Sequence, residues 1–369
     1  MIAALFGIGV LTGGGEEDED VPAPPSSVQV ERVANRLERV RGLEFKRLPP
    51  VRYVTSGEAR EEALAVLDEE YPPERREADE ELLILLGLLP QGADLRDLIG
   101  KIFGEEVAGY YDDKQMTLVG EPGDEPDEVT LAHELTHALE DQHFGLGPQG
   151  GGFGDEAQSA LIEGTATVAM IDYSTRFLAD NRLRRRELLG QLDIADLFAS
   201  GSGLPPYLQR SLVFPYSAGA RFVDAIGTWG PANRALRGKG PVTTEQVLHP
   251  EKYRAGERAL PVPRPRPPGP GWKRATAGTI GEFDTGELIR SSDSAVRAER
   301  AAAGWGGGRY ALWRKDGKST VTLAWRWDTR RDAAEFVAAL PRYIDRTLGG
   351  RPAKVDVGPI VRLTIGPAG

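Results

Sequence analysis

Residues 133–137 read His133-Glu134-Leu135-Thr136-His137, and this pentapeptide is the most informative stretch of the chain. The chain has only 4 histidines, and two of them stand here, four residues apart. On a helix, side chains at this spacing project from the same side, so the two imidazoles can bind one metal ion. The alternative is a surface helix that carries two histidines by chance. Because histidine is scarce in this chain, such a chance occurrence is improbable. The pentapeptide therefore predicts a metal-binding helix on which Glu134 acts as a base toward water.

A third metal ligand is expected beyond this pair, because catalytic zinc takes three protein ligands and leaves one position for water. His143 follows His133 at the spacing of the third histidine in the metzincin pattern HExxHxxGxxH. Glu140, however, stands where that pattern has glycine, and on a continuous helix His143 would lie about 15 Å along the axis from His133. A capping or packing contact at a helix end is the other role open to His143. Glu156 and Glu163 are the carboxylate candidates further along the chain.

Two downstream segments favour Glu163. Residues 160–167, Ala-Leu-Ile-Glu-Gly-Thr-Ala-Thr, resemble the segment that supplies the third zinc ligand in the aminopeptidase branch of the gluzincin metallopeptidases. Residues 214–219, Phe-Pro-Tyr-Ser-Ala-Gly, are similar to the segment of the same enzymes whose tyrosine hydrogen-bonds the oxyanion. The resemblance implies a zincin-like fold that binds one Zn²⁺ ion through the two histidines and Glu163. It also implies that Tyr216 is a catalytic residue beside Glu134.

The resemblance is incomplete in two respects. More residues separate His137 from Glu163 than in those aminopeptidases, and a glycine-rich stretch at 145–154 could absorb the difference at little entropic cost. The GxMEN exopeptidase signature is missing, which argues against a simple transfer of aminopeptidase activity. Over residues 105–255 the chain also resembles a group of largely uncharacterised bacterial zincin-like proteins, which implies a fold and not a substrate.

The composition narrows the classes of protein to consider. The chain has 369 residues, a hydrophobic content of 40% and a net charge of −11 at pH 7. This length is enough for two domains with buried cores, and the negative charge argues against a nucleic-acid partner. The absence of cysteine excludes disulfides, thiolate zinc sites and a cysteine nucleophile. The sequence leaves the oligomeric state open.

The first residues resemble an export signal. Residues 1–11 are an apolar run that is too short to span a membrane and lacks the basic residues that begin a signal peptide. An acidic run, residues 16–20, and a proline-rich stretch then read as a disordered tether. We therefore expect an exported protein, in the extracellular space or the cell envelope, whose membrane contact is at most through this segment. A cytoplasmic protein with a disordered N-terminus is the alternative.

Periodicity and turn signals predict an α+β fold. We expect a signal-like segment and tether at 1–27, a helix-rich zincin-like domain with a small mixed sheet at 28–258, a proline-rich linker at 259–279 and a small α+β domain of unknown role at 280–369. The helices are expected at residues 28–41, 58–70, 79–88, 95–103, 127–143, 155–178, 182–197, 218–227 and 331–343. The strands are expected at residues 51–55, 107–111, 116–119, 308–315, 319–327 and 354–365, the last as one or two strands. The residues Asp112-Asp113-Lys114 are a turn signal that predicts a hairpin of strands 107–111 and 116–119.

The sequence thus predicts a zinc metallopeptidase, a hydrolase that binds a peptide or protein along an edge strand, either 107–111 or 116–119. A non-catalytic zinc-binding scaffold with the same fold is the main alternative, and a zinc hydrolase of non-peptide amides is a weaker one. His249, which precedes Pro250 in an expected loop, is assigned a structural role in preference to one in catalysis.

Overall fold

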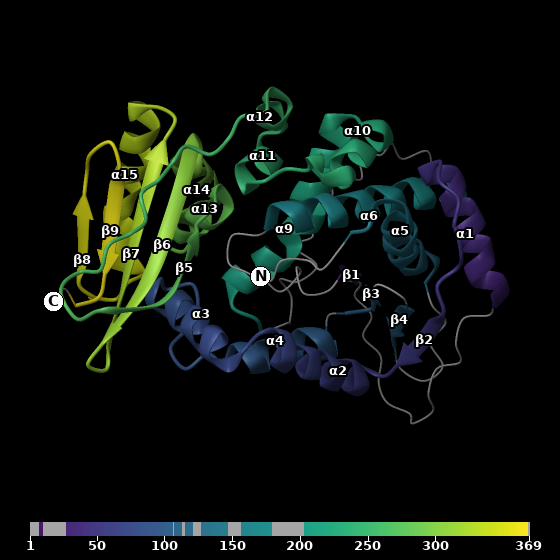
Figure 1. The fold of residues 1–369 in the computed structure, drawn as a ribbon, viewed down its shortest axis with the longest axis horizontal. Helices are drawn as coiled ribbons and strands as arrows, with labels where there is room; N and C mark the ends of the chain where they lie inside the picture. Colours follow the sequence, from purple (N-terminus) through teal and green to yellow (C-terminus); the bar gives the residue numbers. More distant parts are fainter. Residues whose placement is uncertain are drawn as a thin grey trace.

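The computed structural model describes residues 7–9, 27–105, 107–112, 115–120, 127–146, 156–178 and 203–367. The fold is α+β, as the sequence predicts, and contains two small sheets. The two sheets lie toward opposite ends of the long axis, with helices between them (Figure 1). The helix predicted at 182–197 and most of the predicted signal-like segment and tether lie outside the described residues.

The N-terminal sheet is mixed, with the strand order β1-β3-β4-β2. β3 (Gly109–Asp112) and β4 (Gln115–Val119) are antiparallel neighbours, as predicted, although the turn at 113–114 lies outside the described residues. β2 (Val51–Val54) is parallel to β4, and β1 (Gly7–Gly9) is antiparallel to β3. β4 is therefore an inner strand, and residues 7–9 cover the outer edge of β3.

Four long helices lie beside this sheet: α1 (Ser27–Arg41), α5 (Glu128–Phe144), α6 (Glu156–Phe177) and α9 (Pro206–Ile226). α5 contacts both α1 and α6, and α6 makes its most extensive helix contact with α9. Met116 and Leu118 of β4 share a hydrophobic core with Leu131 and Leu135 of α5. This core fixes α5 against the sheet.

Three further helices lead from the N-terminal sheet toward the C-terminal one: α2 (Ser56–Glu70), α3 (Pro73–Leu85) and α4 (Leu95–Glu105) (Figure 1). α2 starts at a capping box, in which the Thr55 hydroxyl accepts from the Glu58 backbone N–H and the Glu58 carboxylate accepts from the Thr55 N–H. Such reciprocal bonds satisfy backbone donors that the first helical turn leaves free.

The C-terminal sheet is antiparallel, with the order β5-β6-β7-β9-β8. Its strands are β5 (Lys273–Thr279), β6 (Trp305–Lys315), β7 (Lys318–Trp327), β8 (Ala353–Asp356) and β9 (Val361–Ile365). Its helices are α13 (Glu282–Arg290), α14 (Ala295–Ala302) and α15 (Arg330–Arg346). Trp325 of β7 packs on Phe336 of α15, with ring centroids 4.9 Å apart, and donates to the Thr285 hydroxyl of α13. The face of the sheet that carries Trp325 is therefore the inner one.

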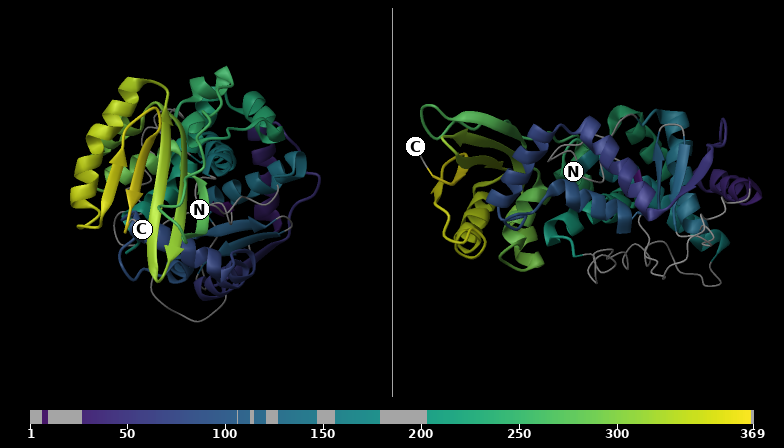
Figure 2. Two further views of the ribbon diagram at one scale, coloured as in Figure 1. Left: turned by 60° about the vertical axis from the view of Figure 1, so that its left-hand side comes forward. Right: turned by 90° about the horizontal axis from the view of Figure 1, so that it is seen from below.

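The predicted linker at 259–279 has two parts. Its first residues are extended and lie against the outer face of the sheet, where the Leu260 N–H donates to the Gly306 carbonyl. Its last seven residues form β5, which pairs with β6. Figure 2 (left) shows this outer face toward the viewer. The short elements before the linker are α10 (Trp229–Arg234), η1 (Ala235–Lys239), α11 (Thr244–Leu248) and α12 (Pro250–Ala255).

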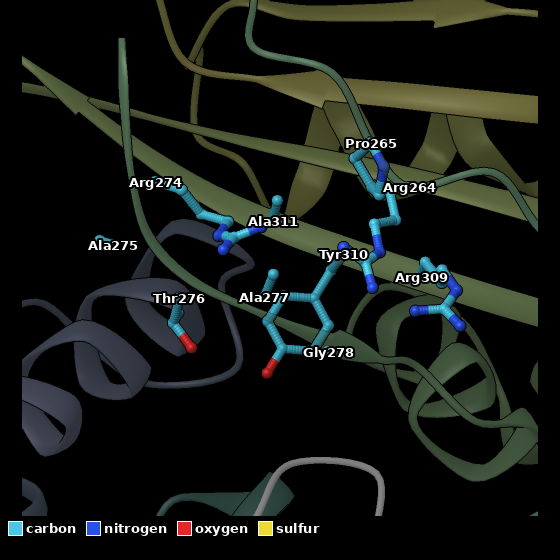
Figure 3. Close-up of a pocket in the computed structure, with 10 residues that line it drawn as sticks. All are labelled: Arg264, Pro265, Arg274, Ala275, Thr276, Ala277, Gly278, Arg309, Tyr310 and Ala311. Carbon is cyan, nitrogen blue, oxygen red and sulfur yellow. The ribbon is translucent and has the colours of Figure 1, made fainter.

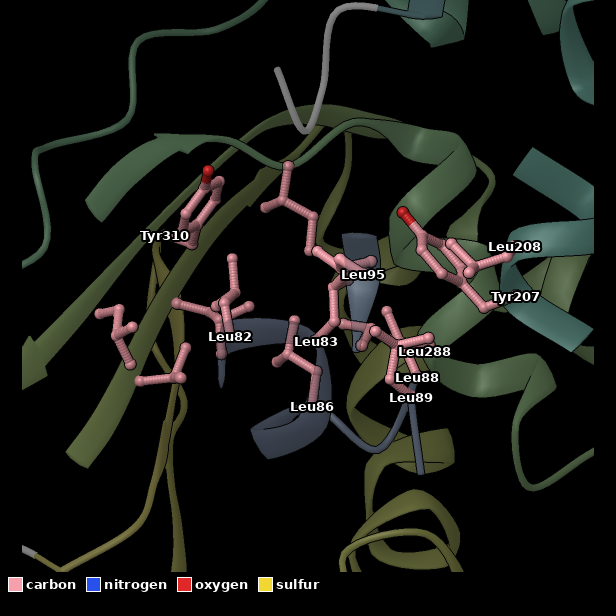
Figure 4. Packing of buried hydrophobic residues seen from close by; sticks show 14 of the residues in the cluster. Leu82, Leu83, Leu86, Leu88, Leu89, Leu95, Tyr207, Leu208, Leu288 and Tyr310 are labelled. Atoms are coloured by element: carbon pink, nitrogen blue, oxygen red, sulfur yellow. The ribbon is translucent and has the colours of Figure 1, made fainter. Parts of the chain in front are cut away.

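One hydrophobic core joins α2, α3 and α4 to α9 and to the inner face of the C-terminal sheet. Figure 4 shows leucines of α3, α4 and the loop between them packed against Leu208 of α9 and Leu288 of α13. The Tyr343 hydroxyl of α15 donates to the Leu86 carbonyl at 2.8 Å within this core. Among the described helices, none is long and apolar enough to cross a membrane.

Candidate metal centre

The helix that carries the pentapeptide is buried on all sides over most of its length. All residues of α5 from 130 to 140 are buried, and the helix ends at Gly145, whose φ of 64° suits a left-handed cap. His133 and His137 are 3% and 2% exposed, and Glu134 is fully buried. The three polar side chains of the motif therefore lie inside the protein, between α5 and the elements that cover it.

Glu163 of α6 meets the two histidines. Its Oε2 lies 3.2 Å from His133 Nε2 and 3.4 Å from His137 Nε2, and the two Nε2 atoms are 3.2 Å apart. Ligands that are about 2.0–2.1 Å from a tetrahedral zinc ion lie roughly 3.3 Å from one another. Two imidazole nitrogens and one carboxylate oxygen are also the ligand types that such an ion takes. These three residues could therefore hold one zinc ion.

The protonation states of His133, His137 and Glu163 depend on one another. Burial lowers the pKa of His133. Burial acts in the same direction on His137, but the charge and hydrogen bond of Glu163, together with the charges of Glu134 and Glu140, outweigh it and raise the pKa of His137 to about 9. Burial raises the pKa of Glu163, but the charges and hydrogen bonds of His137 and His133 together outweigh that effect and lower it. The Glu163 carboxylate is thus charged at neutral pH, and it favours a cation between the two imidazoles.

The crossing of α6 and α9 places Glu163. Gly164 and Gly219 face each other at this crossing, and a Cβ atom built on Gly164 would lie 2.3 Å from the backbone carbonyl carbon of Gly219. A Cβ atom on Gly219 would lie 1.9 Å from the Ala160 carbonyl oxygen. Only glycine permits this approach, so the two glycines of the sequence motifs have a packing role.

Tyr216, three residues before Gly219 on α9, lies beside His133. Its ring stacks on that of His133, with centroids 5.8 Å apart and an angle of 27° between the ring planes. The side chain is 6% exposed. The structure thus brings Tyr216 next to one of the three candidate ligands.

Glu134 lies on the side of α5 that faces the N-terminal sheet. A Cβ atom on Gly109 of β3 would come within 3.2 Å of the Glu134 Cγ. Gly109 is the residue that pairs with Gly9 of β1. The candidate base is therefore next to the point where the N-terminal segment crosses the edge of β3.

The rival third ligands lie elsewhere. The His143 imidazole contacts the Glu44 carbonyl oxygen at 2.8 Å through Nε2, which is the structural role considered for it. Glu156 is buried at the start of α6, close enough to Asp284 that its charge adds to the effect of burial in raising the pKa of Asp284. Neither belongs to the group that converges on His133. His249 contacts Glu282 of α13 at 2.9 Å, so it connects α12 to the C-terminal part of the chain.

A buried ion pair lies behind the candidate ligands, and sequence reasoning did not find it. Arg41 of α1 donates from Nε to Glu140 Oε1 at 2.9 Å, and both side chains are fully buried. The Thr165 hydroxyl donates to the other Glu140 oxygen at 2.7 Å, and the Arg41 guanidinium lies over the Trp229 ring. Glu140 therefore ties α1, α5 and α6 together. The only sequence signal is its place three residues after His137, and that place alone fits a solvated acidic face of the helix equally well.

A second group of carboxylates, Glu245, Glu257 and Asp328, surrounds the Lys252 ammonium. The ammonium lies 2.5 Å from the Glu245 oxygen and 3.0 Å from that of Glu257. Because the Lys252 ammonium already occupies the space between the three carboxylates, the group is an ion-pair network and offers no further cation site.

Comparison with known proteins adds one match. The sequence model of a family described as "Domain of unknown function (DUF8575)" matches residues 270–363, which include β5, β6, β7 and β8 and the first three residues of β9. No match was found among the curated proteins or among the solved structures.

Proposed function

We propose that the protein is a zinc-dependent peptidase of the gluzincin type, which hydrolyses peptide bonds. The observation that carries this proposal is the convergence of His133, His137 and Glu163 within 3.2–3.4 Å of one another in the interior. The glutamate between the two histidines supports an enzyme, because a site that only binds metal does not need a base next to it.

The metal ligands would be His133, His137 and Glu163. Zinc at this position supplies a Lewis acid and brings the pKa of its water toward neutrality. The Glu163 carboxylate provides one negative charge, and the two neutral imidazoles keep the net charge of the site positive. The buried ion pair of Arg41 with Glu140 and the hydroxyl of Thr165 hold α5 and α6 in register, so the ligands are preorganised.

Glu134 and Tyr216 would carry the proton transfer and the charge stabilisation. Glu134 takes a proton from the attacking water and passes it to the leaving amine, a role that contributes about 10²–10⁴-fold to a rate. The Tyr216 hydroxyl donates to the carbonyl oxygen of the scissile bond as negative charge develops on it. One such donor contributes about 2.7–4 kcal/mol.

An extended substrate would add to the outer edge of β3, beside Glu134. The pairing of residues 7–9 with residues 109–111 supports this position, because it places an extended backbone antiparallel to β3. Backbone pairing at a sheet edge binds peptides with little dependence on their side chains. The proposal does not use β4 as the substrate strand, because β4 lies between β2 and β3, whereas the outer edge of β3 is covered only by the three residues of β1.

The test compares the full-length protein with its Glu134→Gln variant. We expect the purified protein to bind one equivalent of zinc and to cleave members of a quenched fluorescent peptide library. Glu134→Gln should keep the zinc and lose about 10²–10⁴-fold of the hydrolysis rate. Glu156→Gln, which changes another buried carboxylate, is the matched control and should retain activity. Equal hydrolysis by wild type and Glu134→Gln would overturn the mechanism, and tight zinc binding without any hydrolysis would favour the scaffold.

A further inference from the structure

The outer face of the C-terminal sheet carries a group of arginines. Arg309 of β6 and Arg362 of β9 both pair with Ala324 of β7, one from each side, so their side chains project from the same face. Arg326 lies two residues from Ala324 on this face. Arg274 of β5 pairs with Trp313, which is four residues from Arg309 and shares its face. All four arginines are exposed.

The extended segment before β5 adds a fifth arginine and creates a hollow. A cavity of about 400 Å³ lies between Arg264 and Pro265 of this segment and strands β5 and β6. Arg264, Arg274 and Arg309 line it, none of its lining residues is acidic, and Figure 3 labels the three arginines among the residues that line it. Residues 258–278 contain five basic residues and no acidic one, in a chain with a net charge of −11.

These five arginines differ from others in the protein. Arg41, Arg52 and Arg210, for example, each form an ion pair with a glutamate. Within the described part of the chain, no hydrogen bond or ion pair joins Arg264, Arg274, Arg309, Arg326 or Arg362 to a carboxylate. Asp356 of β8 stands opposite Arg362, and its carboxylate pairs with Lys354 at 2.9 Å. Like charges left unpaired on one face repel one another, and an anionic ligand would relieve that repulsion.

We propose that this outer face binds an acidic polypeptide segment in an extended conformation. The guanidinium group suits this ligand, because its planar donors match the geometry of a carboxylate. The face already packs against an extended polypeptide, since residues 259–272 lie across it and Leu260 hydrogen-bonds to Gly306. The inference does not depend on the zinc site or on peptidase activity.

The same features disfavour nucleic acid as the ligand. Proteins that bind single strands stack the bases on exposed aromatic rings. Trp272 and Trp313, which lie on this side of the sheet, are only 8% and 7% exposed and pack in a small cluster with Ala311. The overall charge of −11 also opposes a long polyanion, whereas a short acidic segment would contact the arginines alone.

The test is a binding titration with the full-length protein and a fluorescein-labelled peptide of alternating glutamate and serine. We expect saturable binding that weakens at least tenfold between about 50 mM and 300 mM NaCl, because the contacts are exposed charges. A peptide with glutamine in place of glutamate should not bind. The double variant Arg309→Gln/Arg362→Gln should weaken binding at least tenfold, and Arg309→Lys less than that, because lysine keeps the charge and loses the planar donors.

The matched control is Arg297→Gln/Arg300→Gln on α14, which removes the same charge from another surface and should bind as wild type does. Circular dichroism checks that each variant is folded. The proposal is overturned if the acidic peptide does not bind at low salt, or if both double variants lose affinity equally. It is also overturned if a 20-base-pair DNA duplex or phosphatidylserine vesicles bind through these arginines and the peptide does not.

Discussion

Gly164 of α6 and Gly219 of α9 meet backbone to backbone, with no room for a side chain on either. Each glycine stands near a residue of the candidate site, Glu163 in one helix and Tyr216 in the other. The crossing therefore sets how far these two side chains reach toward His133. A larger residue at either glycine would separate the helices and alter the site at the same time.

We expect Gly164→Ala and Gly219→Ala each to destabilise the fold by about 1–3 kcal/mol or more, because the added methyl group meets backbone that cannot move alone. Zinc affinity should fall as well, since Glu163 moves with its helix. Chemical denaturation and zinc titration measure the two effects. Gly57→Ala is the control, because a Cβ there would meet only the Thr55 hydroxyl, at 3.9 Å. Unchanged stability in Gly219→Ala would contradict this packing.

Glu163→Gln should lower zinc affinity while the fold persists. Loss of a residue that only orients a ligand costs about 10–100-fold in metal affinity, so loss of a charged ligand should cost roughly 100-fold or more. Glu156→Gln and His143→Gln should bind zinc as wild type does, because neither side chain faces the histidines. Competition with a chromophoric chelator measures the zinc affinity of all three variants. A normal affinity in Glu163→Gln would remove Glu163 from the ligand set.

Replacing only one partner of the Arg41–Glu140 ion pair should lower the free energy of unfolding. Arg41→Met leaves a buried carboxylate without its cation, which costs about 3–5 kcal/mol. The double variant Arg41→Met/Glu140→Gln should recover part of that loss, because it no longer buries an unpaired charge. Arg39→Met, an exposed arginine of the same helix, should change the free energy of unfolding by less than about 0.5 kcal/mol. Equal losses in the single and double variants would contradict this interpretation.

The contact of His249 with Glu282 should make stability depend on pH. The hydrogen bond to Glu282 raises the pKa of His249 above its ordinary value of 6.5. A histidine with a raised pKa stabilises the folded state below its unfolded pKa, and that stabilisation is lost as the pH rises through the folded pKa. Wild type should therefore exceed His249→Gln in stability by more at about pH 6 than at about pH 8.5. Denaturant melts at both pH values measure this, and an equal difference at both would refute it.

Residues 7–9 occupy the edge of β3 that the proposed substrate needs. The double variant Ile8→Pro/Gly9→Pro should release β1, because consecutive residues of an antiparallel strand alternate in donating to the neighbour and proline cannot donate. We expect faster amide hydrogen exchange in residues 109–112 and faster hydrolysis of peptides. Ile8→Ala, which keeps every backbone donor, is the control. Exchange is measurable without a known substrate, and unchanged exchange would show that β1 is not what protects β3.

Local sequence patterns predicted those helices, strands and site residues that a short motif of a few residues indicates. The pentapeptide predicted a helix at 127–143, which is close to α5, and the turn residues after Tyr111 predicted the hairpin of β3 and β4. The Glu-Gly pair at 163–164 pointed to the residue that meets the histidines. In each case a short motif carries both its geometry and its chemistry.

The sequence was less informative about features that depend on packing between residues far apart in the chain. A helix was expected at 218–227, yet α9 begins at Pro206 and continues through Pro215, because its buried face packs on α6. The contact of Arg41 with Glu140 joins residues 99 positions apart, so no local pattern reveals it. The charge on the outer sheet face was equally hidden, since it arises only when the strands align Arg309 with Arg362.

The core that α2, α3 and α4 share with the C-terminal sheet has a consequence during synthesis. Leu82, Leu86 and Phe103 emerge from the ribosome early, but Leu363 and Ile365, which belong to the same core, emerge roughly 260 residues after Phe103. At about 5–20 residues per second, this delay lasts roughly 13 to 50 s. During that time the apolar faces of the early helices lack these partners. The core that they share with the C-terminal sheet can therefore form only after β9 has been synthesised.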